Sequence, residues 1–375
     1  MSKALNMDLI YCFFDAANMH RWNDHLRPIE LTELDKQAHK MAIAWMLAKF
    51  EETNGANINW TELIENSMFS FIQRLILTDL KPQLFHKIKQ ERPKELNEFV
   101  ISEFETAVPN CNADFKKRFV KYLEGKRTSK EDQVIRAAHY LATNWEFRLI
   151  KDMNRSMFGI AQTERDIELE LMAHSGLMGL REMVNKSAYG FVDLFGQLRF
   201  QQRWARTPRI PKTTVLGHSI LVANMVHLNN LDKKAGKEQI YMDYFKALFH
   251  DLPEVLTKDV ISPVKNRISG LNKLLEDYEE EMMESKVIPL IPPQWMDEFR
   301  TLIYDPFGAK DNTDSGYDIK TCDLLGAYIE ADLSIRYGVG SDKLKSSRDE
   351  LREKLIERKG IDSKGLIERL DAMTV

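Results

Sequence analysis

Two histidines and two aspartates in this chain have the residue types of a metal site. His218 lies within an apolar helical pattern, the pair His250–Asp251 ends the next one, and Asp323 lies on a third. Two imidazoles and two carboxylates suit a divalent transition metal and leave coordination positions for water and a substrate oxygen. Such a metal lowers the pKa of water and polarises a phosphoryl oxygen. Taken singly, His218 is more often a core histidine and Asp323 a helix-start carboxylate, so the predicted metal site depends on the four together.

The elements that position these residues are predicted to be helices. Apolar residues recur at helical period over 32–52 and again over 213–230, the stretch that contains His218. Thr213 and Thr214 are suitable N-cap residues for the second of these helices. Gly and Pro together make up about 8% of the chain, compared with roughly 12% in average proteins. Few helix breakers and few alternating patterns predict an all-α protein.

The stretch around His250 has a specific resemblance. The order H…HD…D is typical of the HD superfamily of metal-dependent phosphohydrolases, and "HDLPEVLTKDVISPVK" (250–265) resembles the bacterial 5'-deoxynucleotidase family within it. The pair Arg203–Trp204 lies a short distance before His218, and this spacing is also a feature of that family. The resemblance covers roughly residues 188–340. It implies a helical HD-domain bundle that hydrolyses a phosphate ester.

The resemblance also implies a role for each matching residue. The implied metal ligands are His218, His250, Asp251 and Asp323, and Asp251 and Glu254 are the implied catalytic residues. Glu254 would act as the acid/base, Arg203 as the phosphate clamp, and Trp204 as a wall that favours 2'-deoxyribose. Asp259 is an implied sugar or outer-shell contact, and Lys265 an implied phosphate-side charge. The residues alone leave open that Trp204 only packs and that Glu254 only solvates a helix.

The first half of the chain resembles the second. Three landmarks recur in the same order at a nearly constant separation: Arg21–Trp22 with Arg203–Trp204, Asp79 with Asp251, and Asp152 with Asp323. We therefore expect two tandem HD-domain bundles, with residues 1–180 as the first domain and 181–375 as the second.

The first copy is predicted to be catalytically dead. Lys36 or Gln37 stands in place of His218, Thr78 in place of His250, and Pro82 or Gln83 in place of Glu254. The retained Arg21 and Trp22 leave two interpretations open. They either pack, or still bind a nucleotide or phosphate and regulate the other half.

Composition limits the other functions. The net charge is −4 and the pI is about 6.2, which gives no support to duplex nucleic-acid binding. Cys12, Cys111 and Cys322 lack metal-type spacing, and no run predicts a signal peptide or membrane span, so we expect a reduced, cytoplasmic protein.

The predicted substrate is a (deoxy)nucleoside 5'-monophosphate. The alternatives are another nucleotide (a dNTP, a cyclic nucleotide or an alarmone), or a nucleotide-sensing scaffold through the N-terminal half. The cofactor would be one divalent metal among Mn, Co, Fe, Ni and Zn. Since members of the family commonly form homodimers, the resemblance implies a homodimer or an internal pseudo-dimer.

Overall fold

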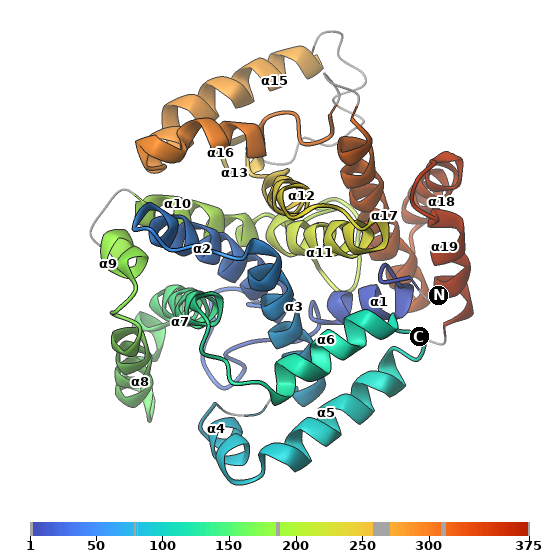
Figure 1. Ribbon diagram of the computed structural model, residues 1–375. Helices are drawn as coiled ribbons and strands as arrows, with labels where there is room; N and C mark the ends of the chain where they lie inside the picture. Colours follow the sequence, from blue (N-terminus) through green and yellow to red (C-terminus); the bar gives the residue numbers. More distant parts are fainter. Residues whose placement is uncertain are drawn as a thin grey trace.

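The computed structural model describes residues 3–78, 80, 82–184, 188–257, 271–308 and 313–373, except the side chains at positions 82, 83, 86, 184 and 272. Its elements are helices (Figure 1). Within the described residues the only β-type pairing is two isolated bridges, His20 with Thr32 and Gln202 with Thr214. The predicted all-α class is confirmed.

The helices of the N-terminal half lead from the first residues to the middle of the chain. They are α1 (Met7–Asp15), α2 (Glu33–Thr53), α3 (Trp60–Leu77), α4 (Pro82–Glu91), α5 (Pro93–Ala107), α6 (Ala113–Glu124), α7 (Lys130–Ile150), η1 (Asp152–Asn154), α8 (Ile160–Ala173) and α9 (Met178–Val184). The predicted domain boundary at 180/181 falls within α9 and stays a prediction.

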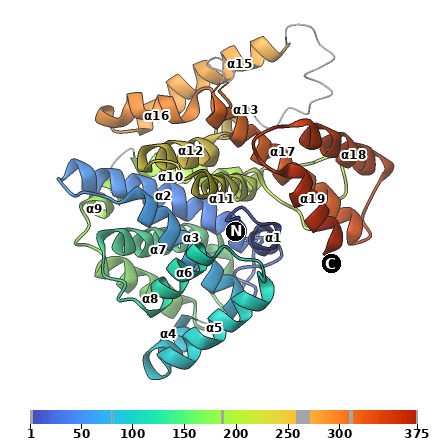
Figure 2. The same cartoon turned by 45° about the vertical axis from the view of Figure 1, so that its right-hand side comes forward.

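The C-terminal half continues with α10 (Ala188–Gly196), η2 (Gln197–Phe200), α11 (Val215–Lys233), α12 (Lys237–Phe249), α13 (Glu254–Thr257), α15 (Leu271–Met282), η3 (Met283–Val287), η4 (Ile288–Leu290), η5 (Pro293–Trp295), α16 (Met296–Ile303), α17 (Asp314–Arg336), α18 (Asp342–Glu357) and α19 (Ser363–Ala372). Figure 2 shows α17, α18 and α19 gathered at one side of the molecule, and α15 with α16 beyond α12. No described helix is both long enough and apolar enough to cross a membrane.

The two helices predicted from apolar periodicity lie at the centre of the molecule. α2 and α11 pack against each other, and nearly every residue of both is buried. Thr32 caps α2, and Thr214 caps α11 by accepting from the Gly217 N–H at 3.0 Å. The Thr214 hydroxyl also donates to Asp35 of α2 at 2.6 Å. Because an N-cap fixes where a helix begins, these threonines set the position of the residues one turn later, Lys36 and His218.

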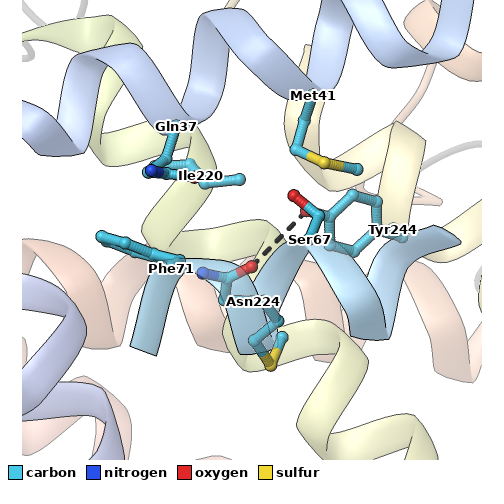
Figure 3. A pocket seen from close by; sticks show the side chains of 8 residues that line it. Gln37, Met41, Ser67, Phe71, Ile220, Asn224 and Tyr244 are labelled. Carbon is cyan, nitrogen blue, oxygen red and sulfur yellow. Dashed lines mark hydrogen bonds between the residues drawn. The ribbon is translucent and has the colours of Figure 1, made fainter. Parts of the chain in front are cut away.

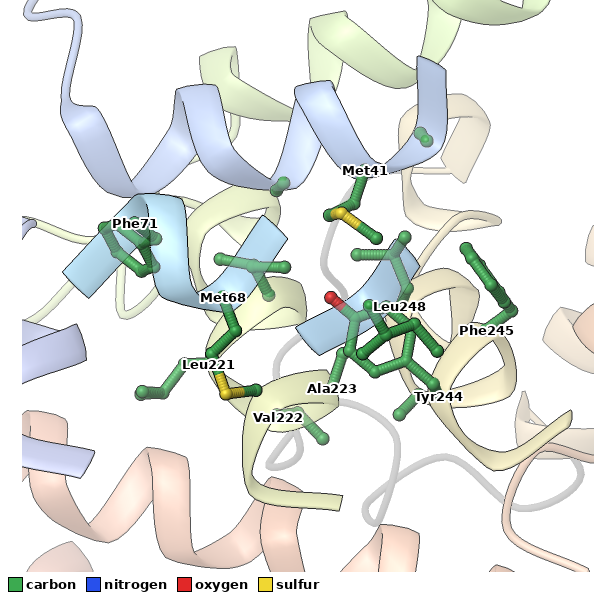
Figure 4. Packing of buried hydrophobic residues seen from close by; sticks show 14 of the residues in the cluster. Met41, Met68, Phe71, Leu221, Val222, Ala223, Tyr244, Phe245 and Leu248 are labelled. Carbon is green, nitrogen blue, oxygen red and sulfur yellow. The ribbon is translucent and has the colours of Figure 1, made fainter. Parts of the chain in front are cut away.

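A single buried apolar cluster draws on both halves. In Figure 4, Met41 of α2, Met68 of α3, Leu221 of α11 and Leu248 of α12 converge in it. Trp45 has no exposed surface, and its indole N–H donates to the Tyr241 hydroxyl at 2.9 Å, so the contact joins α2 to α12. Each such buried side chain contributes roughly 1.5–3 kcal/mol. The halves therefore share one core.

Polar side chains also meet between the halves. Gln37 and Ser67 from the first half face Asn224 and Tyr244 from the second, around a cavity too small to hold a water molecule (Figure 3). The Tyr244 hydroxyl donates to the Asn224 side-chain oxygen at 3.5 Å. These groups are packed rather than hydrated, so the cavity is part of the core and not a ligand site.

Candidate metal centre

Three helices bring the predicted metal ligands together. His218 lies in the first turns of α11, His250 is the C-cap residue of α12, and Asp323 lies in the middle of α17. One ligand atom of each lies within 4.8 Å of the other two. His218 Nε2 is 3.0 Å from Asp323 Oδ1, and His250 Nε2 is 3.9 Å from the same oxygen. The position of Asp323 inside a helix rules out the helix-start alternative.

The fourth predicted ligand, Asp251, lies next to this group. Its Oδ2 is 3.2 Å from His250 Nε2 and 3.5 Å from Arg203 Nη1. Asp323 is held from its other side, since Lys320 donates to Asp323 Oδ2 at 2.6 Å. The two carboxylates therefore present one oxygen each toward the imidazoles.

The histidine hydrogen bonds suit a cation. His250 Nδ1 lies 2.7 Å from the Ala247 carbonyl, which can only accept, so Nδ1 carries the proton. His250 Nε2 is buried and forms no hydrogen bond with a described residue. In the neutral ring this Nε2 lone pair faces the Asp251 carboxylate, and two acceptors at 3.2 Å repel unless a proton or a metal ion lies between them. The donor set therefore fits a divalent cation.

The surroundings favour the protonation states that metal binding requires at Asp251, Asp323 and His218. At His250, by contrast, burial is outweighed by Asp251 and Asp323, which raise its pKa, so this imidazole must lose a proton to ligate. Burial alone would raise the pKa of Asp251, but His250 and Arg203 bring it down to about 2. Burial likewise opposes ionisation of Asp323, yet His218 and Lys320 hold its pKa well below the usual range. Burial and Arg203 lower the pKa of His218. Two carboxylates and a neutral imidazole are thus ready to ligate.

Glu330 is a functional candidate that the sequence prediction missed. It accepts hydrogen bonds from Trp204 Nε1 at 2.8 Å, Arg203 Nε at 3.2 Å and the Thr213 hydroxyl at 2.6 Å. Its carboxylate also lies 3.7 Å from His218 Nδ1, which is too far for a hydrogen bond but places a negative charge behind the predicted ligand. Glu330 follows Asp323 by two helical turns, so the two lie on one face of α17, and this spacing could have identified it.

The Arg203–Trp204 pair is held in an unusual conformation. Trp204 has a φ of 58°, and the flanking backbone is closed by the bridge between Gln202 and Thr214. Arg203 Nε binds Glu330, while its Nη1 points to Asp251. The Arg203 guanidinium therefore contacts both Glu330, which lies near His218, and Asp251, which follows His250.

Glu254 begins α13, and its backbone N–H donates to the Asp251 carbonyl at 3.1 Å. Its carboxylate is close enough to Arg203 to raise the pKa of that guanidinium further. The predicted acid/base residue is thus beside the metal group. Asp259 and Lys265 lie outside the described residues.

The N-terminal half repeats part of this arrangement. Trp22 has a φ of 56°, and the bridge between His20 and Thr32 closes the same loop. Glu146 of α7 accepts from Trp22 Nε1 at 2.9 Å and Arg21 Nε at 2.8 Å, as Glu330 does for Trp204 and Arg203.

The residues at the positions of the predicted metal ligands have changed. Lys36 follows Arg21 at the same spacing as His218 follows Arg203, so Lys36 takes the place of His218. His139 precedes Glu146 by two helical turns, as Asp323 precedes Glu330. Lys36 Nζ lies 3.1 Å from His139 Nε2. A lysine–histidine contact thus stands where the other half has a histidine–aspartate contact.

Asp152 is not the counterpart of Asp323. That predicted match is wrong, because Asp152 lies in η1 after α7, is 75% exposed and pairs with Arg155. His139 holds the equivalent place. The predicted match of Asp79 to Asp251 lies outside the described residues, as do the side chains of Pro82 and Gln83. His39, which lies three residues after Lys36, cannot replace the missing histidine, since its Nε2 is hydrogen-bonded to the Val192 carbonyl at 2.8 Å.

Comparison with known proteins agrees with the geometry. Residues 190–364 match the family described as 5'-deoxynucleotidase YfbR-like. The 5'-deoxynucleotidase plu3092 of Photorhabdus laumondii is 25% identical over 137 residues, which are 36% of this chain and 68% of that protein. A 5'-deoxynucleotidase of Shewanella oneidensis is 28% identical over 142 residues, again 36% and 68%. One from Vibrio atlanticus is 24% identical over 184 residues, 46% of this chain and 88% of that protein.

Among solved structures, an HD-domain phosphohydrolase from Listeria innocua aligns with a TM-score of 0.41 at 20% identity, covering 49% of this chain and 86% of that one. The family match begins within α10 and contains His218, His250, Asp251, Asp323 and the Arg203–Trp204 pair. Residues 190–364 are therefore similar to the YfbR-like 5'-deoxynucleotidase family, and the similarity includes the residues of the candidate metal centre.

Proposed function

We propose that the C-terminal half is a metal-dependent phosphomonoesterase that hydrolyses nucleoside 5'-monophosphates, deoxy forms in particular, to nucleoside and phosphate. The observation that carries this proposal is the meeting of His218, His250 and Asp323 within 4.8 Å, beside an Arg203 that contacts Asp251. The family match of residues 190–364 supports the same reaction.

The proposed cofactor is one divalent transition metal held by His218, His250, Asp251 and Asp323. When bound, such a metal lowers the pKa of water and polarises a phosphoryl oxygen. Mixed imidazole and carboxylate donors accept Mn, Fe, Co, Ni and Zn, so availability decides among them. The Ala247 carbonyl orients His250 through a hydrogen bond, and the Glu330 carboxylate lies 3.7 Å from His218 Nδ1.

The remaining side chains act on the substrate. Arg203 keeps its charge and directs Nη1 into the site, where its planar fork can pair with two phosphoryl oxygens and offset the negative charge that develops at phosphorus. Glu254 accepts a proton from the attacking water and can return it to the leaving 5'-oxygen. Trp204 is proposed to face the sugar, with its indole N–H fixed by Glu330.

A phosphate-release assay tests the proposal. The purified chain is stripped with EDTA, supplied with Mn or Co, and given ribo- and deoxynucleoside 5'-monophosphates, a dNTP and a cyclic nucleotide. We expect metal-stimulated release from 5'-monophosphates and the highest kcat/KM for deoxy forms. Release from dNTP or cyclic substrates alone would replace the proposed substrate, and no bound metal with no release would contradict an enzymatic role.

We propose further that residues 1–180 are a degenerate copy of the same domain. The contacts among Arg21, Trp22 and Glu146 support this proposal. They match those among Arg203, Trp204 and Glu330, although in the described part of the N-terminal half other residues stand in place of the predicted metal ligands. Catalysis would then reside in residues 181–375 alone.

A further inference from the structure

The N-terminal half contains a cluster of basic side chains between α2, α3 and α7, formed by Arg21, Lys36, Lys40, Arg74 and His139. We propose that this cluster is a second, metal-free binding site for the phosphate group of a phosphomonoester. The site is separate from the proposed catalytic centre, and its existence does not depend on the reaction there.

The floor of the cluster is two buried lysines. Lys36 and Lys40 are each 1% exposed and lie one turn apart on α2. Lys36 Nζ contacts the His139 ring nitrogens at 3.1 and 3.2 Å, and Lys40 Nζ donates to the Ser70 hydroxyl at 3.2 Å. Neither ammonium forms an ion pair with a carboxylate of the described residues. A buried charge with only neutral partners is costly, and a bound anion would offset that cost.

The carboxylates near the cluster are already shared between arginines. Glu33 lies 2.8 Å from Arg21 Nη1 and 3.6 Å from Arg74 Nε. Glu146 accepts from Arg21 at 2.8 Å and from Arg199 at 3.1 Å. Glu33 and Glu146 therefore form their ion pairs with guanidiniums and not with Lys36 or Lys40. A phosphate dianion would supply the anionic partner that the two lysines lack among the described residues.

The two arginines of the cluster are partly accessible to solvent. The Arg21 side chain is 12% exposed and that of Arg74 is 31% exposed, and His139 is half-buried above Lys36. In the catalytic half Arg203 is 15% exposed over two fully buried histidines. Both halves thus place a partly exposed arginine beside buried basic or imidazole side chains.

Burial also lowers the pKa values of three basic groups in this cluster. Burial lowers the pKa of Lys40 to about 7, and the nearby Glu33 only partly offsets it. Burial, together with Arg21, lowers the pKa of Lys36 further, and burial with Lys36 lowers that of His139. An anion placed among these groups would raise their pKa values. Phosphate binding at neutral pH should therefore take up protons.

Calorimetric titration of the full chain tests the site. The Arg203→Gln variant, with EDTA present, removes the guanidinium and the metal of the catalytic half, and inorganic phosphate is added at constant ionic strength. We expect binding with proton uptake, detected as a heat that changes with the ionisation enthalpy of the buffer. Adding Lys36→Met to Arg203→Gln should weaken binding about tenfold or more, since it removes a charge-assisted hydrogen bond. Lys116→Met, which removes an exposed lysine of α6 paired with Glu105, is the matched control and should change nothing.

A second titration with 2'-deoxyadenosine 5'-monophosphate separates free phosphate from an esterified source. Tighter binding than inorganic phosphate assigns the site to a nucleotide, and equal binding assigns it to phosphate alone; both support a phosphate site. The proposal is overturned if Arg203→Gln binds neither ligand below about 10 mM, or if Lys36→Met binds as tightly as its parent. The second outcome would leave Arg21 and Trp22 as packing residues. Metal-stimulated phosphate release by the wild type is unaffected by either result.

Discussion

The two halves of this protein share an arrangement of one arginine, one tryptophan and one glutamate, but the side chains next to it differ in charge. In each, an arginine and a left-handed tryptophan donate to a buried glutamate, Glu146 in the first half and Glu330 in the second. The second half adds Asp251 and Asp323 beside two histidines, a donor set that fits a metal. The first half adds two buried lysines, Lys36 and Lys40, at the site proposed to bind an anion.

The change at one helix position accounts for much of this difference. Lys36 and His218 each lie one turn after an N-cap threonine, Thr32 and Thr214, so helix geometry places both side chains alike. An imidazole there is a neutral donor that can bind a metal. An ammonium carries its own charge and cannot ligate while protonated. One substitution thus exchanges a predicted metal ligand for a basic amine.

The largest expected effect comes from moving a residue of the first half into the second. Asp323→His, which copies His139, should lower kcat/KM on the order of a thousandfold or more, because it removes a carboxylate from the metal group. The reverse change, His139→Asp, should leave kcat/KM within about threefold, since the two sites are independent. Steady-state phosphate release measures both. Similar losses in the two variants would mean that the first half takes part in catalysis.

The shared core should make the halves unfold together. Trp45→Ala removes an indole with no exposed surface between α2, α12 and α16, and should cost about 3–5 kcal/mol in the free energy of unfolding. Phe158→Ala, at a fully exposed position, should stay within about 0.5 kcal/mol. Urea unfolding followed by circular dichroism measures both. Two separate transitions, with only one shifted in Trp45→Ala, would show that the halves are independent.

Glu330 and Glu146, which occupy equivalent positions in the two halves, should differ in their effects: Glu330 on kcat/KM and Glu146 on stability. Glu330→Gln keeps the shape but removes the charge behind His218 and Arg203, and should lower kcat/KM about 10- to 100-fold. Glu146→Gln should leave kcat/KM within about threefold while lowering the melting temperature, because Arg21 and Arg199 lose their buried partner. Equal kcat/KM losses would contradict the assignment of catalysis to one half.

The smallest effect concerns the buried lysine Lys40, which faces Glu33, Ser70 and the neighbouring Lys36 and His139. Its pKa is about 7 in the folded chain and about 10.5 when unfolded. Between these values the unfolded chain binds more protons, so wild-type stability rises with pH. Lys40→Met should therefore be more stable than the wild type by about 1–3 kcal/mol at pH 7, with the difference shrinking toward pH 10.5. Denaturant unfolding at several pH values, without phosphate, checks this; a constant difference would contradict it.

Local patterns predicted the helices, and they identified His218, His250 and Asp323 as residues that the structure brings together. Apolar period marked α2 and α11, and the threonine caps were visible before them. Glu330 was missed because its role depends on packing against Trp204 from another element. His139 was missed for a different reason: a carboxylate was sought, and Asp152 supplied one in a surface turn. The search for a second carboxylate therefore led to Asp152, whereas the two-turn spacing to Glu146 would have identified His139 as the counterpart of Asp323.

Metal content per chain tests the central contrast most directly. After dialysis against Mn or Co, elemental analysis should find about one equivalent in the wild type and in His139→Asp, and close to none in Asp323→His. That result would place the single metal among His218, His250, Asp251 and Asp323. Metal retained in Asp323→His, or lost in His139→Asp, would contradict the division of the molecule into a metal-binding half and a cation-rich half.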